Sequence, residues 1–71
     1  TWLEIGTNKL INKIDEIEIF NILGQKPIHI KNIHSSKHIF SPKDLSILSP
    51  GIYFIKISSQ NRTQMKKIAV L

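Results

Sequence analysis

A proline followed by a glycine, Pro50-Gly51, stands directly before a run of β-branched and aromatic residues. Proline fixes φ near about −65° and glycine adopts positive φ without steric cost, so the pair is a strong turn signal. After it, Tyr53, Ile55 and Ile57 recur at a period of two, which predicts a half-buried strand with these side chains inward. The chain is therefore expected to be a β-domain built around this central strand, with Pro50 as a structural turn residue.

Other alternating segments predict further short strands. These segments are residues 2–6, 17–20, 25–31, 38–40 and 63–71. Asn21 and Gly24 hold the first and fourth positions of a connection, which predicts a type I turn with a glycine bulge and makes Gly24 a second structural turn residue. Pro27 cannot donate to a strand ladder, so its strand is expected at a sheet edge or at a bulge.

The segments between the strands give weaker signals. We interpret Leu10–Ile14 as a loop or partial strand, Asn32–Lys37 as a polar loop, Asp44–Leu48 as a single turn over one end of the core, and residues 59–62 as a hairpin loop. Six or seven short strands without an ordinary helix predict an all-β fold, a small antiparallel immunoglobulin-like β-sandwich. The side chains expected inside are Ile17, Ile19, Ile28, Ile30, Tyr53, Ile55, Ile57, Ile68 and Val70.

Length and composition limit the class of protein. Seventy-one residues form a single domain, 1–71, and without cysteine it has neither a disulfide nor a thiolate. No apolar run reaches the roughly 20 residues of a membrane helix, and no signal peptide opens the chain. Because Thr1-Trp2-Leu3 resembles the middle of a strand, we expect an N-terminally truncated fragment of a longer secreted protein.

The net charge of +5 leaves two interpretations open. A basic surface suits an acidic partner, whereas lysines also protect exposed strand edges from unwanted pairing. Nucleic-acid binding is disfavoured, because single-strand binders expose aromatic side chains for stacking. Here Phe40, Tyr53 and Phe54 are expected to lie largely in the core.

Catalytic and metal-binding motifs are missing from the sequence. Glu16 and Glu18 share one strand face and are expected to be solvated, so they do not form an acid–base pair. His34 and His38 are four residues apart, with His29 upstream, but the segment between them is predicted as loop and no acid or cysteine completes a ligand shell. We expect no enzyme, no cofactor and no metal.

Three segments together resemble a known family. Residues 17–25, from Ile17 to Gln25, resemble the strand, turn and glycine near the start of the C-terminal sorting domain of the type IX, or Por, secretion system, type A. Residues 44–57, from Asp44 to Ile57, resemble its middle, and residues 66–71, from Lys66 to Leu71, resemble its end. The order and spacing match over roughly residues 10–71, although the family's usual Tyr-Pro-Asn-Pro-like opening is missing.

The resemblance implies a non-catalytic signal that directs a cargo through the secretion system. Its implied partners are proteins, namely the outer-membrane translocon, a sortase-like peptidase and a cargo domain N-terminal to it, with no nucleic acid and no membrane embedding. The implied route runs through the periplasm to the cell surface or the extracellular space. By matching position, Gly51, Tyr53, Lys66, Lys67 and Ile68 are the candidate recognition residues.

One alternative from another class stays open at this point. A small immunoglobulin-like sandwich can also serve as an accessory module that holds a carbohydrate or a neighbouring domain on an extracellular enzyme or adhesin. The two hypotheses differ in position, because a sorting domain must end its polypeptide. For a sorting domain, a strand at the chain end offers backbone groups to a receptor by strand addition, and Lys66 and Lys67 add electrostatic steering.

Overall fold

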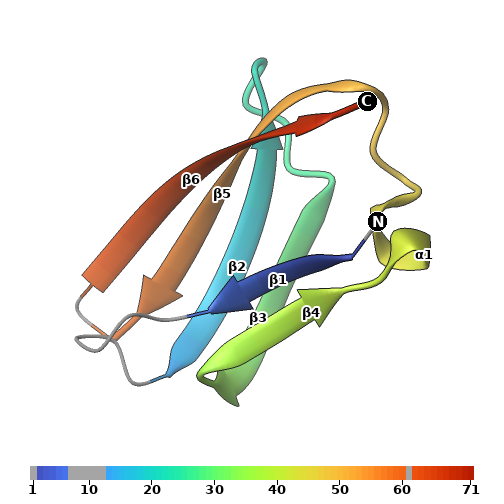
Figure 1. Ribbon diagram of the computed structural model, residues 1–71. Coiled ribbons are helices and arrows are strands. Elements are labelled where there is room, and N and C mark those ends of the chain that lie inside the picture. The colour runs from blue at the N-terminus through green and yellow to red at the C-terminus, as the bar shows by residue number, and fades with distance from the viewer. Residues whose placement is uncertain (1, 7–12, 61) are drawn as a thin grey trace.

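The computed structural model describes residues 2–6, 13–60 and 62–71, which form six strands and one short helix (Figure 1). The elements are β1 (Leu3–Gly6), β2 (Ile14–Asn21), β3 (Ile28–Ser35), β4 (Lys37–Phe40), α1 (Pro42–Leu45), β5 (Gly51–Ser59) and β6 (Arg62–Val70). The prediction of an all-β domain with six or seven short strands is confirmed.

The strands form two antiparallel sheets. One sheet has the order β3-β2-β5-β6, and the other pairs β1 with β4. Figure 1 shows the short β1–β4 pair lying across one face of the larger sheet. The two sheets enclose the core, so the predicted antiparallel sandwich is confirmed. No helix among the described residues is long and apolar enough to span a membrane.

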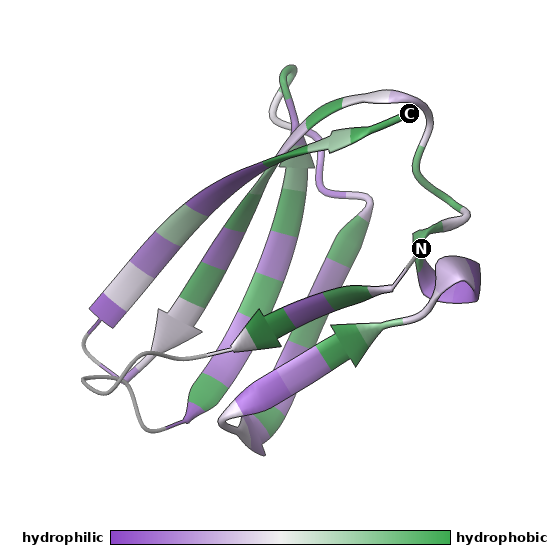
Figure 2. Cartoon of the chain, in the orientation of Figure 1, coloured by the Kyte–Doolittle hydropathy of each residue, from purple (hydrophilic) through white to green (hydrophobic). Residues whose placement is uncertain are grey.

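The core is formed mainly by isoleucines that alternate along the strands (Figure 2). Its buried members are Ile5, Ile14, Ile17, Ile19, Ile28, Phe40, Leu48, Tyr53, Ile55 and Ile57. The inward positions predicted on β2 and β5 are correct, because the period of two is uninterrupted there. β-Branched side chains suit this pleated surface since their χ1 angles are already restricted.

A register shift at the start of β2 explains one residue that the sequence pattern missed. Ile14 pairs with Ser35, whereas Glu16 pairs with Lys31, so β3 carries two more residues than β2 between these pairs. Such an irregularity breaks the alternation of side chains, and both Ile14 and Ile17 point into the core. Of the segment Leu10–Ile14, interpreted as a loop or partial strand, Ile14 belongs to β2 and Lys13 does not, which agrees with a partial strand, and residues 10–12 lie outside the described residues.

The predicted polar loop at Asn32–Lys37 is wrong in part. β3 continues to Ser35, and Lys37 already belongs to β4. Asn32 and His34 have positive φ angles of 58° and 51°, which a regular strand does not contain and which Asn and His tolerate better than most residues. The polar composition therefore marks an irregular edge strand, consistent with the edge position expected from Pro27.

The small sheet covers the large one incompletely. Ile30, Ile68 and Val70 pack against the core but are only partly buried, so their predicted place inside holds only in part. Four-residue strands are too short to cover four strands of eight or nine residues, and β6 lies at the uncovered side (Figure 1).

The outer face of the large sheet holds two further corrections. Phe54, expected in the core, is half-buried on this face and pairs with Phe20. Glu18, expected to be solvated, is 6% exposed because neighbouring side chains from the adjacent strands and from Lys26 cover it.

Helix α1 is a single turn with a complete cap. The Ser41 hydroxyl accepts a hydrogen bond from the Asp44 amide, and the Asp44 carboxylate accepts one from the Ser41 amide at 2.8 Å. Pro42 occupies the first helical turn, where its missing N–H has no cost. Leu48, which follows the helix, is buried in the core. The sequence predicted a single turn at Asp44–Leu48 over one end of the core, and the helix instead begins at Pro42.

Candidate functional site

The β5–β6 hairpin brings the five candidate recognition residues together. Gly51 pairs with Val70 and Tyr53 pairs with Ile68, while Lys67 lies opposite Phe54 and Lys66 opposite Ile55. The residues come from sequence positions 13 to 17 apart, and the antiparallel register aligns them at one end of the hairpin. Their roles in recognition stay predictions.

Tyr53 has a clear structural part in this arrangement. Its side chain is 6% exposed, and its hydroxyl donates a hydrogen bond to the carbonyl oxygen of Ser49 at 2.6 Å. Buried tyrosine hydroxyls require such a partner, and this one fastens the segment before the Pro50-Gly51 turn to the start of β5. The geometry resembles a tyrosine corner, and it leaves little of the side chain for a receptor to touch.

The two predicted turn glycines differ in backbone conformation. Gly24 has φ of +84°, and its amide donates to the Asn21 carbonyl at 3.1 Å. The Asn21 side-chain oxygen also accepts from the Leu23 and Gln25 amides, so the predicted turn is confirmed in detail. Gly51 has φ of +155°, which is also a positive angle that L side chains rarely adopt, so both positions favour glycine.

The paired lysines point to opposite faces of β6, as adjacent strand residues must. Lys67 lies on the outer face beside Phe54, and Lys66 lies on the inner face beside Ile55. Both are exposed, Lys67 because it lies on the outer face and Lys66 because the small sheet does not reach over β6. Ile68, between them and the chain end, is half-buried. The surface thus combines cationic side chains on both faces with an apolar side chain and a sheet edge.

A second polar cluster, which sequence reasoning missed, lies on the outer face across β2 and β3. Lys26 binds the Glu18 carboxylate at 2.9 Å, and His29 binds Glu16 at 3.1 Å. The Lys26 hydrogen bond lowers the pKa of Glu18 against the opposing effect of burial. The signal that could have found this cluster is the glutamate pair at 16 and 18, facing cations on both neighbouring strands.

Glu16, Glu18 and His29 are also the residues that come nearest to a metal site. Their potential ligand atoms all lie within 4.8 Å of one another, but Glu18 is already neutralised by Lys26. Of the two histidines whose spacing was considered for a metal site, His34 lies 3.8 Å from Asp15 and His38 packs edge-on against the Phe40 ring. Among the described residues, neither joins a group of three potential ligands. The absence of a metal stays a prediction.

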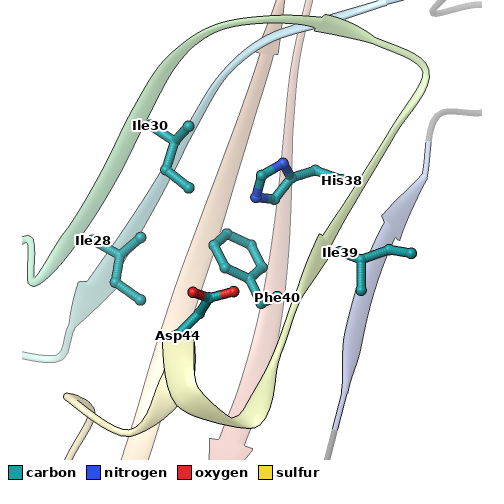
Figure 3. A pocket seen from close by; sticks show the side chains of 6 residues that line it. All are labelled: Ile28, Ile30, His38, Ile39, Phe40 and Asp44. Carbon is teal, nitrogen blue, oxygen red and sulfur yellow. The ribbon is translucent and has the colours of Figure 1, made fainter.

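A shallow groove opens between β3 and the β4–α1 segment (Figure 3). It has a volume of about 280 Å³ and is lined by Ile28, Ile30, His38, Ile39, Phe40 and Asp44. Hydrogen bonds from Ser41 lower the pKa of Asp44, so this carboxylate is held in its charged form at the helix cap. The groove is a mostly apolar surface that also includes the His38 imidazole and the Asp44 carboxylate, which already accepts a hydrogen bond from Ser41.

The comparisons with known proteins identify the family. A family model described as a secretion system C-terminal sorting domain matches residues 2–71. No curated protein and no solved structure matches the chain. The match extends beyond the three segments that carry the sequence resemblance, and it favours a sorting signal over the accessory module. With the sandwich fold and the three segments in register, the chain belongs to the C-terminal sorting domains of the type IX secretion system, which are non-catalytic signals for secreted cargo.

Proposed function

We propose that the secretion machinery reads this domain as a folded surface centred on β6, by adding a strand to its free edge. The observation that carries the proposal is the position of β6, which is the last strand of the larger sheet and, among the described residues, pairs on one side only. An exposed edge presents backbone donors and acceptors to a partner strand. The proposed partner is a protein of the outer-membrane translocon.

The side chains of β6 fit this mode of binding. Lys66 and Lys67 are exposed on opposite faces, so a strand added at the edge meets one cation on each side of the sheet. Rim charges of this kind mainly accelerate association and select acidic partners. Ile68 supplies a half-buried apolar side chain beside them, while Gly51 and the buried Tyr53 act through the shape of the hairpin.

The remaining steps follow from the family's task. The family signals export to the cell surface or the extracellular space, and we infer passage through the periplasm on the way. We further infer that the cargo lies N-terminal to the domain and that a sortase-like peptidase removes the domain after translocation. In all of these steps the domain acts as a ligand without catalysis.

The test is delivery of a passenger protein fused to the domain in a bacterium with an intact type IX apparatus. The double variant Lys66→Ala/Lys67→Ala is expected to leave the passenger in the periplasm. Its melting temperature should stay near that of the unchanged domain, because exposed substitutions usually change stability by no more than about 0.5 kcal/mol. Surface protease accessibility and cell fractionation measure delivery.

A matched control changes two other exposed lysines, Lys31→Ala/Lys37→Ala, which lie on β3 and β4, away from β6. This variant removes the same charge and should be delivered normally. Equal delivery of both double variants would contradict a role for the lysine pair, and equal loss would indicate that only net charge matters.

A further inference from the structure

One end of the sandwich exposes large apolar side chains from four separate segments. These side chains are Trp2 before β1, Ile22 and Leu23 in the β2–β3 turn, Ile47 between α1 and β5, and Leu71 after β6, and each is at least 63% exposed. Figure 1 shows the β2–β3 turn, the α1–β5 connection and both termini along the same side of the molecule. We call these five residues the apolar end.

Among the described residues, the opposite end has a different character. Its β3–β4 turn contains Ser35, Ser36 and Lys37, and its β5–β6 hairpin contains Gln60 and Arg62. In Figure 2 the tip of the β2–β3 turn is coloured hydrophobic, whereas the start of β6 is coloured hydrophilic. Isolated exposed apolar residues need no explanation, but several gathered at the turns of one end indicate an interaction surface.

Cationic side chains lie just behind the apolar end. Lys67 pairs with Phe54, which pairs with Phe20, and the Lys26 ammonium lies 5.8 Å from the centre of the Phe20 ring. This row is two residues, or about 7 Å, behind Ile22, a distance that the long lysine stems can span. Lys43 adds a further cation on α1.

The acids near this end already have partners, and Glu4 lies 3.5 Å from the Lys37 ammonium. Glu18 accepts from Lys26 at 2.9 Å, and Asp44 accepts from the Ser41 amide at 2.8 Å. Lys43 and Lys67 are exposed, and no ion pair within the described ranges involves them. Apolar side chains at projecting turns, followed by unpaired lysines, match the layering of an anionic lipid surface, in which charged headgroups overlie the acyl region.

We propose that the apolar end docks on an anionic lipid surface. Ile22, Leu23 and Trp2 enter the boundary between headgroups and acyl chains, where tryptophan is favoured, and Lys43 and Lys67 meet the lipid phosphates. Docking of this kind is peripheral and reversible, and Lys67 is the one lysine that it shares with the surface proposed for the secretion machinery. It would hold the sorting domain at the membrane that its cargo must cross, with the backbone edge of β6 and Lys66 still open to a protein partner.

The chain's single tryptophan provides a direct probe, because Trp2 belongs to the apolar end. We expect the 71-residue chain to co-sediment with vesicles of 30 mol% phosphatidylglycerol in phosphatidylcholine, with a blue shift of Trp2 fluorescence. Binding should weaken as salt rises. Ile22→Ser/Leu23→Ser should lower the partition coefficient by about tenfold or more, and Lys43→Gln by about fivefold.

Met65→Ser is the matched control, because Met65 is an exposed apolar side chain in the middle of β6. It should change the partition coefficient by less than about twofold if the apolar end is the docking site. Failure to bind these vesicles, equal binding to pure phosphatidylcholine, or an unchanged Ile22→Ser/Leu23→Ser variant would each overturn the proposal. A blue shift that rises with protein concentration without lipid would replace it with self-association.

Discussion

The two edges of the larger sheet are built differently. The β3 edge is held to β2 by the Lys26–Glu18 ion pair and by two histidine–carboxylate contacts, His29 to Glu16 at 3.1 Å and His34 to Asp15 at 3.8 Å. The β6 edge has no ion pair within the described ranges, and the buried Oε1 atom of Gln64 has no hydrogen-bond partner. Side-chain contacts and backbone hydrogen bonds together hold β3 to β2, whereas β6 is held to β5 by backbone hydrogen bonds.

The backbones of the two edges differ in the same sense. β3 follows Pro27 and contains positive φ angles at Asn32 and His34, features that prevent another strand from pairing along it. β6 pairs with β5 without interruption from Gly51↔Val70 to Ser59↔Arg62, so its outer side has the regular spacing that a partner strand requires. The contrast indicates that strand addition, where it occurs, occurs at β6.

The largest expected effect comes from a position in the middle of the sheet, between the two edges. Ile55 is fully buried and pairs with Ile19 on one side and Lys66 on the other. Ile55→Ala should lower the free energy of unfolding by about 2–5 kcal/mol through lost burial and a residual cavity. Urea unfolding followed by circular dichroism measures it, with exposed Met65→Ala as the control. A loss below about 1 kcal/mol would contradict the core assignment.

A smaller effect is expected at the two turns that lead into the edges. Gly24, before β3, has φ of +84°, and Gly51, at the start of β5 opposite the end of β6, has φ of +155°. A Cβ atom at either site meets nothing within 4 Å, so any cost of substitution comes from the backbone. Gly24→Val and Gly51→Val should each cost about 1–3 kcal/mol. Urea unfolding measures both, and an unchanged stability at either site would contradict the turn assigned there.

Much of this fold could be predicted from alternation and turn chemistry. Ile17, Ile19, Ile55 and Ile57 face inward as expected, because their strands keep a period of two. The Gly24 turn was also predictable, since the conformation is dictated by local residues. Ile14 was not, because a register shift depends on the partner strand. The partial burial of Ile68 and Val70 could not be predicted either, because it depends on how far the second sheet reaches.

The candidate site also has features that the sequence predicts and features that it does not. That Lys66 and Lys67 point to opposite faces follows from sequence alone, but the exposure of Lys66 depends on how far the small sheet reaches over the inner face. The alternation of the sequence predicts a solvated Glu18, but in the sheet the side chains of the adjacent strands and of Lys26 cover it. The groove beside Phe40 joins β3 to α1 across two sheets, and no local pattern predicts such a junction.

The smallest expected effect concerns the ion pair that leads into the β3 edge. Lys26 lowers the pKa of Glu18 below the ordinary value of 4.5. A carboxyl group whose pKa is lower in the folded state contributes stability above its unfolded pKa and loses it as pH falls through the folded pKa. The contribution of Glu18 should therefore be complete above about pH 5 and decline below pH 4.5.

Lys26→Met removes this contribution and leaves Glu18 buried without its cation. We expect a loss of about 1 kcal/mol at pH 7, kept small because half of the Lys26 side chain is exposed. The loss should shrink on acidification as Glu18 becomes protonated, so the variant has a flatter pH profile than the unchanged chain. Lys37→Met, which breaks the exposed pair with Glu4, is the matched control and should change stability by less than about 0.5 kcal/mol at either pH. Parallel profiles for the two variants between pH 3 and pH 7 would show that the β3 edge gains nothing from burying this pair, and the contrast between the two edges would then rest on backbone geometry alone.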